Sequence, residues 1–192
     1  MKKQFLGYII TVFALLATVI AFGQSGNKFY ASIDDYNNNL PIAGFEIEDK
    51  GLGSNSVVLV SENGTKRTRL SKLPSELYTY NGDLYRTYKT WTHQVLIVGP
   101  ICYYLLVGGN YQVEGEHYSQ YFSETITSKL NRYSDDWLKK YLIKYDLYED
   151  YKKEAPKRVM IDDPKNTFKS QQFKRNVKYI KLLNEKILNS NS

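Results

Sequence analysis

Cysteine is nearly absent from this sequence, which has one, Cys102, among 192 residues. A single cysteine excludes a disulfide within the chain. Cys102 lies inside the apolar run 95–107, where a lone thiol acts as a small hydrophobic side chain of low reactivity. A nucleophilic role would need a histidine and an orienting group beside the thiol, and no local pattern supplies them. Cys102 is therefore predicted to be structural.

The sequence also lacks the motifs that mark many catalytic and cofactor sites. It contains no G-x-S-x-G, H-E-x-x-H or C-x-x-C pattern, no phosphate-binding loop and no dinucleotide-binding glycine pattern. We therefore predict no catalytic residue, no cofactor and no metal site, and the sequence favours a protein without enzymatic activity.

Histidine is scarce as well, with only His93 and His117. They leave one enzymatic alternative open, a small metal-dependent or hydrolytic enzyme in which a histidine acts with nearby carboxylates such as Glu114 and Glu116. On a strand, alternate side chains point to opposite faces, so these two carboxylates would face away from His117. A site of this kind would need the fold to bring His93 to them.

Residues 1–23 have the parts of a secretory signal peptide. Two lysines precede the apolar run 5–22, and Ala21 and Gly23 put small residues where signal peptidase requires them. We predict cleavage after Gly23 and a mature chain that is periplasmic, at the cell surface or secreted. No cysteine follows the run, so an N-terminal lipoprotein anchor is excluded. The alternative is an uncleaved inner-membrane anchor, since about 20 apolar residues span a bilayer.

Charge is uneven along the mature chain. Residues 24–123 carry 8 basic and 10 acidic side chains, a net −2, whereas residues 124–192 carry 16 basic and 10 acidic side chains, a net +6. An exported chain with an acidic first half is a poor nucleic-acid binder, so no nucleic-acid partner is expected. The 18 tyrosines are the most unusual count, and tyrosine suits half-buried sheet surfaces and binding faces.

The first part of the mature chain is a polar N-terminal segment, residues 24–42, followed by a β-rich domain, residues 43–122. The Asp and Asn residues at 34–39 lack the pattern of a calcium loop and are predicted to form a turn. Within the domain, apolar and polar residues alternate, which is typical of strands.

Two Asn-Gly pairs predict hairpins in this domain. Asn63-Gly64 predicts a type I′ turn between strands. At Asn81-Gly82, a two-residue loop would set Tyr78 opposite Tyr85 as a cross-strand aromatic pair.

Residues 123–192 are predicted to be a helical region that packs on the sheet, with helices over about 134–155 and 165–189. Ser134 is a good N-cap. The second helix has a basic polar face and an apolar face formed by Phe173, Val177, Ile180, Leu183 and Ile187. We expect the apolar face to dock on the sheet. The alternative is a peripheral membrane protein, in which this helix binds an anionic membrane surface.

Together these patterns predict an α+β fold. A curved antiparallel β-meander, or a partly closed small barrel, would be followed by two amphipathic helices.

Four stretches of the chain also resemble small secreted proteins of the Bacteroidetes. These are the signal end Ala21–Gln24, the Leu73–Tyr78 stretch with Gly82–Arg86, the run Gly99–Tyr104 and the helical close Tyr179–Lys186. The resemblance implies an exported protein and identifies no functional residue.

The sequence therefore predicts a non-catalytic cell-envelope or periplasmic protein with a binding or structural role. Its partner would be an envelope protein or polymer. The candidate partner-binding residues are tyrosines that cluster around one hairpin: Tyr78, Tyr80, Tyr85 and Tyr88.

Overall fold

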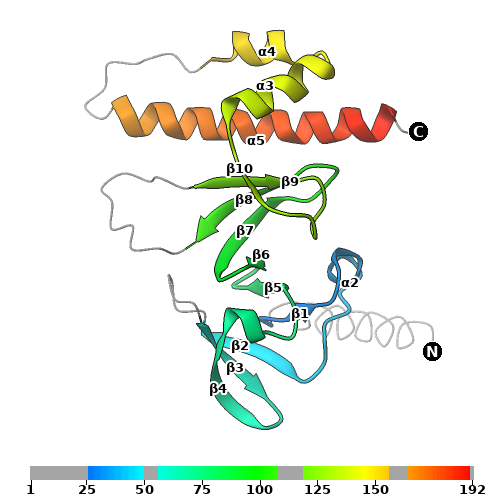
Figure 1. Ribbon diagram of the computed structural model, residues 1–192, viewed down its shortest axis with the longest axis vertical. Helices are drawn as coiled ribbons and strands as arrows, with labels where there is room; N and C mark the ends of the chain where they lie inside the picture. Colours follow the sequence, from blue (N-terminus) through cyan, green and yellow to red (C-terminus); the bar gives the residue numbers. More distant parts are fainter. Residues whose placement is uncertain (1–25, 50–55, 108–118, 156–163, 191–192) are drawn as a thin grey trace, which may run out of the picture.

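Two antiparallel sheets and a layer of helices make up the protein in this computed structural model, which describes residues 26–49, 56–107, 119–155 and 164–190. Figure 1 shows the helical layer above a central sheet and a smaller sheet below it. This architecture confirms the predicted α+β class and the antiparallel meander. Among the described residues both sheets are open, and neither closes into a barrel.

The larger sheet has seven strands in the order β1-β5-β6-β7-β8-β9-β10, and the smaller has the order β2-β3-β4. The strands are β1 (Phe29–Tyr30), β2 (Phe45–Asp49), β3 (Ser56–Ser61), β4 (Gly64–Arg69), β5 (Leu77–Tyr80), β6 (Asp83–Tyr88), β7 (Trp91–Ile97), β8 (Cys102–Val107), β9 (Gln120–Ser123) and β10 (Asn131–Arg132). A short 3-10 helix, η1 (Leu70–Lys72), follows β4. The meander therefore begins before the predicted boundary at residue 43, because β1 belongs to it.

Residues 27–30 join the two sheets. On one side β1 pairs with β5, and on the other Lys28 bridges to Glu46 of β2. Backbone hydrogen bonds continue this second contact, from Ile42 N to Phe29 O at 2.8 Å and from Ile47 N to Asn27 O at 3.1 Å. The two sheets are thus linked through this short segment of the chain.

The two Asn-Gly hairpins differ in their turns. At Asn81-Gly82 the prediction is confirmed: both residues have positive φ, 52° and 84°, as a type I′ turn requires, and Tyr78 pairs with Tyr85. At the first hairpin the predicted turn is wrong. Gly64 pairs with Ser61 as the first residue of β4, so the loop is Glu62-Asn63. In this hairpin only Gly64 has a positive φ, 96°. Asn63 does not have the positive φ that a type I′ turn requires.

The helices are α2 (Ile33–Asn37), α3 (Asp135–Lys144), α4 (Tyr148–Lys153) and α5 (Pro164–Ser190). Ser134 caps α3 as predicted, since its side chain accepts a hydrogen bond from Trp137 N. The single helix predicted over 134–155 is instead two, because Asp146 takes a left-handed conformation with φ 56° and turns the chain. The residues at 34–39, predicted as a turn, form most of α2 and its C-terminal end.

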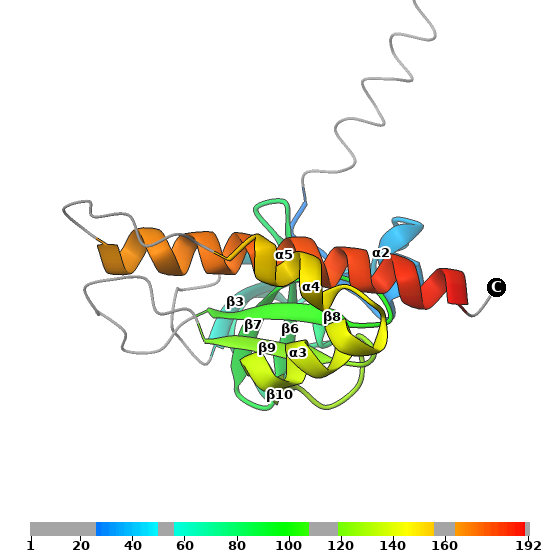
Figure 2. The same ribbon diagram turned by 90° about the horizontal axis from the view of Figure 1, so that it is seen from above.

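Helices α3, α4 and α5 cover one face of the larger sheet, whereas Ile33 and Tyr36 of α2 pack with Leu77 and Tyr104 on the other face. Figures 1 and 2 show α5 crossing above the sheet, with α4 on its far side. The predicted apolar face of α5 packs on the sheet as expected: Ile180 and Leu183 are fully buried, in a cluster with Tyr103 and Leu138. The other apolar side chains of this face, Phe173, Val177 and Ile187, are partly buried against the same cluster.

A buried amide fastens α5 to the β7–β8 turn. The side chain of Asn184 accepts a hydrogen bond from Ile101 N and donates one to Ile101 O, both at 2.8 Å. Gly99 leaves the room for it, because a Cβ on Gly99 would lie 2.5 Å from Asn184 Nδ2. The tertiary contact therefore requires both residues.

Candidate functional site

The four tyrosines predicted to bind a partner do not share a surface. Tyr78 is 0% exposed, and its ring stacks on that of Tyr85 with centroids 5.6 Å apart. Both lie in the core between the two sheets, on the helix-covered face, and Tyr80 packs partly against the same cluster. Tyr88 is half-buried and lies on the opposite face, beside Arg86.

Burial dominates the chemistry of the central tyrosine pair. It raises the pKa of Tyr78 to about 12, although a hydrogen bond to Thr92 Oγ1 at 3.1 Å acts the other way. Burial also raises the pKa of Tyr85. These hydroxyls therefore stay protonated at neutral pH, and the two rings lie in one apolar cluster with Ile47 and Val57 of the smaller sheet.

The opposite face of the larger sheet is called here the Arg86 face. The strand register sets Leu77, Arg86, His93 and Leu106 side by side on it, across β5, β6, β7 and β8. A neighbouring row contains Tyr104, Tyr121 and Arg132, from β8, β9 and β10. Residues paired directly across antiparallel strands point to the same side. The topology thus collects two cations, an imidazole and two phenols from five strands.

Arg86 is the largest buried side chain of this face, at 1% exposed. Its guanidinium donates hydrogen bonds to Ser128 O at 2.8 Å and Thr127 O at 3.0 Å, and Glu76 approaches Nε to 3.5 Å. Glu76 is itself exposed to solvent. The main function of Arg86 is therefore to fasten the 124–130 loop across the sheet, where Ile126 and Leu130 pack.

His93 lies beside Arg86 and is 3% exposed. Its ring meets the ring of Tyr121 edge to face, with centroids 5.0 Å apart. Nδ1 is buried and has no hydrogen-bond partner among the described residues. Burial lowers the pKa of His93 to about 4. The positive charge of Arg86 also lowers this pKa, whereas a hydrogen bond with the Arg86 backbone raises it. His93 is therefore neutral at physiological pH.

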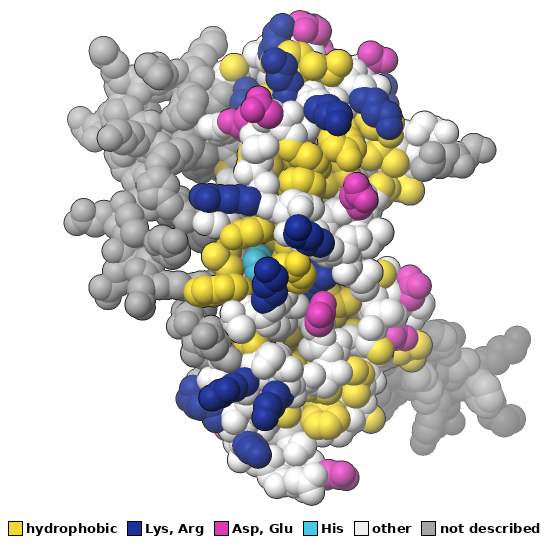
Figure 3. Space-filling model, viewed as in Figure 1, with side chains coloured by type: hydrophobic (Ala, Val, Ile, Leu, Met, Phe, Trp, Pro, Cys, Tyr) yellow, Lys and Arg dark blue, Asp and Glu magenta, His cyan; other side chains and the backbone are white. Residues whose placement is uncertain are grey.

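Around His93 the Arg86 face carries exposed aromatic surface, which we call the aromatic patch: Tyr88, Trp91, Leu106 and Tyr121. Trp91 is 43% exposed, and the other three are half-buried. Figure 3 shows a histidine at the centre of a ring of hydrophobic side chains, with Lys and Arg side chains on either side of it. The patch thus combines apolar surface with a rim of positive charge.

Lys89 and Arg132 contribute to this rim. Both are exposed, and neither takes part in an ion pair formed between described residues. Lys89 occupies the β6–β7 loop with φ 58°, and its ammonium lies 5.7 Å from the centroid of the Tyr88 ring. A non-glycine residue in this region carries backbone strain of about 1 kcal/mol or more. The turn sets Tyr88 opposite Trp91.

The alternative enzymatic site falls partly outside the described residues, which do not include Glu114, Glu116 and His117. Within the described part of the chain, no three His, Cys, Asp or Glu side chains gather as metal ligands would. Cys102 is buried, its thiol donates a weak hydrogen bond to Gly99 O at 3.4 Å, and burial raises its pKa. This environment agrees with the predicted structural role.

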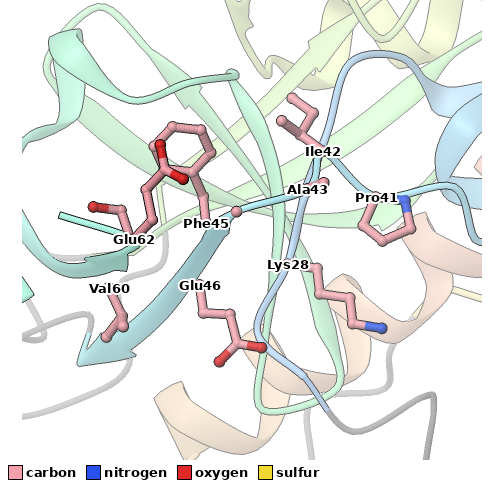
Figure 4. A pocket seen from close by; sticks show the side chains of 10 residues that line it. Lys28, Pro41, Ile42, Ala43, Phe45, Glu46, Val60 and Glu62 are labelled. Carbon is pink, nitrogen blue, oxygen red and sulfur yellow. The ribbon is translucent and has the colours of Figure 1, made fainter. Parts of the chain in front are cut away.

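A shallow hollow of about 360 Å³ lies at the smaller sheet. Figure 4 shows Pro41 and Ile42 across from Val60 and Glu62, with Lys28 and Glu46 at its border. The lining combines carboxylates, an ammonium group and apolar side chains, but none of these residues is buried.

Sequence reasoning identified Tyr88 but missed Trp91, Tyr121 and Arg132. A local signal existed for Trp91 alone. It follows Tyr88 after a two-residue loop, so the two rings could be expected to pair across strands. The pairing of Tyr121 with Arg132, by contrast, depends on the return of the chain after the 124–130 loop.

No helix among the described residues is long and apolar enough to cross a membrane. Comparison of the whole chain with protein-family models, with curated proteins and with solved structures finds no match.

Proposed function

We propose that this chain is an exported, non-catalytic binding protein of the cell envelope, which uses the aromatic patch to hold an acidic partner protein. The observation that carries the proposal is the exposure of Trp91 within a continuous aromatic surface rimmed by Lys89 and Arg132. Export is supported by the features of residues 1–23 in the sequence.

The composition of the patch supports a protein–protein contact. Trp, Tyr and Arg are enriched where proteins bind each other, and residues of these types provide most of the binding energy. Trp91 lies between Tyr88 and the buried His93, so a partner side chain placed on Trp91 would also contact the neighbouring rings. Removing a central tryptophan of this kind costs about 2 kcal/mol or more of binding free energy.

The rim determines the charge of the partner. Lys89 and Arg132 lack a carboxylate neighbour in an ion pair within the described chain, whereas the charge of the buried Arg86 is paired with Glu76. A partner with acidic side chains around an apolar centre would complement this arrangement, and its association would slow as salt concentration rises.

The test is a capture experiment with three versions of the mature chain, residues 24–192. Wild type, Trp91→Ala and Val98→Ala are immobilised and exposed to solubilised envelope proteins of the source organism. Val98 is the matched control, because it is also 43% exposed but belongs to the β7–β8 turn.

We expect an acidic protein that binds wild type and Val98→Ala and is at least tenfold depleted on Trp91→Ala. Arg132→Glu should weaken the same capture. Equal capture on wild type and Trp91→Ala would contradict the proposal, and so would binding to envelope polysaccharide with no protein retained.

A further inference from the structure

From the geometry of the smaller sheet we infer a second interaction surface, the free edge of β4, which binds an extended acidic peptide segment as an added strand. This goes beyond the proposed function, since β4 is not part of the aromatic patch. The inference combines three features of β4: its place in the sheet, the exposure of its residues and its charge.

The strand order leaves β4 with one neighbour. It pairs with β3 over six residue pairs, from Ser56↔Arg69 to Ser61↔Gly64, and no other described strand pairs with it. The other edge of the smaller sheet, β2, is bridged to Lys28 at Glu46, and the edge strands of the larger sheet, β1 and β10, have two residues each. Across the described ranges, β4 is thus the long free edge, with about 20 Å of backbone at 3.3 Å per residue.

The exposure of β4 leaves this edge accessible. All its residues are exposed except Thr68, which is half-buried. An edge strand presents unpaired N–H and C=O groups on its outer side, and these are the groups that an incoming strand uses. Backbone hydrogen bonds would give the contact its strength, and side chains would give it specificity.

The charge of β4 selects the incoming segment. Lys66, Arg67 and Arg69 lie within the strand, Lys72 follows in η1, and all four are exposed. None takes part in an ion pair formed between described residues, and Arg67 makes one long hydrogen bond, 3.4 Å, to Ser56 Oγ. Figure 3 shows Lys and Arg side chains gathered at the end of the molecule that holds the smaller sheet.

The side chains alternate along β4, and this gives the peptide a pattern. Arg67 and Arg69 point to the side of Ser56 and Val58, whereas Lys66 points to the side of Leu59 and the core. An added strand would place its own side chains in the same two rows. Acidic residues at alternate positions would therefore meet Arg67 and Arg69 together.

Cations on an edge strand also have a simpler use, because charged side chains keep free edges from aggregating. The two explanations differ in what they predict for the backbone of a bound peptide. Edge protection predicts no bound strand, and attraction by charge alone does not depend on peptide N–H groups.

The experiment measures fluorescence anisotropy of a labelled ten-residue peptide of alternating threonine and glutamate, titrated with the mature protein at low salt. A second peptide has the same sequence with alternate backbone amides N-methylated, and a third has lysine in place of glutamate. The protein variants are Arg67→Glu/Arg69→Glu and Trp91→Ala, each checked for folding by circular dichroism.

We expect the acidic peptide to bind wild type and Trp91→Ala equally. N-methylation, the lysine peptide and the Arg67→Glu/Arg69→Glu variant should each weaken binding at least tenfold. Equal binding of the N-methylated peptide would show attraction by charge alone, and absence of binding would leave edge protection as the role of the cations. Either result overturns the inference without affecting the proposed function, which depends on Trp91.

Discussion

Acidification tests the neutral imidazole of His93. The side chain is 3% exposed beside the buried guanidinium of Arg86, so adding a proton places a second positive charge in the same desolvated region. In the unfolded chain, solvent surrounds the ring and its pKa returns to the ordinary histidine value of 6.5, whereas in the folded protein the pKa is lowered to about 4.

The sign and size of the effect follow from linkage. Between these two pKa values the unfolded state binds a proton that the native state does not, so the free energy of unfolding falls as the pH falls from 6.5 to about 4. Each pKa unit corresponds to about 1.4 kcal/mol, and the whole loss is about 3 kcal/mol. The dependence fades as the pH rises above 6.5, because the ring is then neutral in both states.

Urea unfolding of wild type and His93→Gln over this pH range measures the effect. The free energy of unfolding of wild type should fall more steeply than that of His93→Gln, by close to one proton per molecule, while titration of the carboxylates cancels in the difference. An NMR titration of the ring gives its pKa directly. Parallel pH profiles of the two proteins, or a ring pKa near 6.5 in the folded state, would refute the reasoning.

Four further substitution and labelling experiments test the packing. Arg86→Lys keeps the charge but loses the planar fork that holds two loop carbonyls, so urea unfolding should show about 2 kcal/mol less stability, and unchanged stability would contradict that role. Asn184→Ala leaves Ile101 N–H and C=O without their partner and should cost about 3 kcal/mol. Gly99→Ala should destabilise wild type but have little effect on Asn184→Ala, and additive costs would argue against the steric contact. The thiol of Cys102 should resist a thiol reagent in the native protein and react in urea, and rapid native labelling would contradict its burial.

Much of the fold could be predicted because its signals are local. Asn81-Gly82 fixed the Tyr78–Tyr85 pairing through turn chemistry, and Ser134 marked the start of α3. The first hairpin was misjudged because two turn types fit a sequence with Asn63-Gly64, and the register between β3 and β4 distinguishes them. The break between α3 and α4 at Asp146 could not be predicted in this way, because no proline or glycine stands there.

The candidate site was harder to predict because its residues converge from distant strands. Period-two alternation places Tyr88 and Arg86 on one face, but it does not reveal that the 124–130 loop covers Arg86 and leaves Trp91 exposed. Burial of Tyr78 and Tyr85 likewise depends on the smaller sheet folding over them. Tyrosine count alone does not distinguish core positions from binding positions.

Site-specific photocrosslinking tests the central claim, binding through the aromatic patch, most directly. A photoreactive phenylalanine is placed at Trp91 in one protein and at Val98 in another, the two positions having equal exposure, and irradiation is carried out in intact cells of the source organism. The proposed function predicts a discrete crosslinked product with one acidic envelope protein from position 91 and none from position 98. The same products from both positions, or none from position 91, would contradict it.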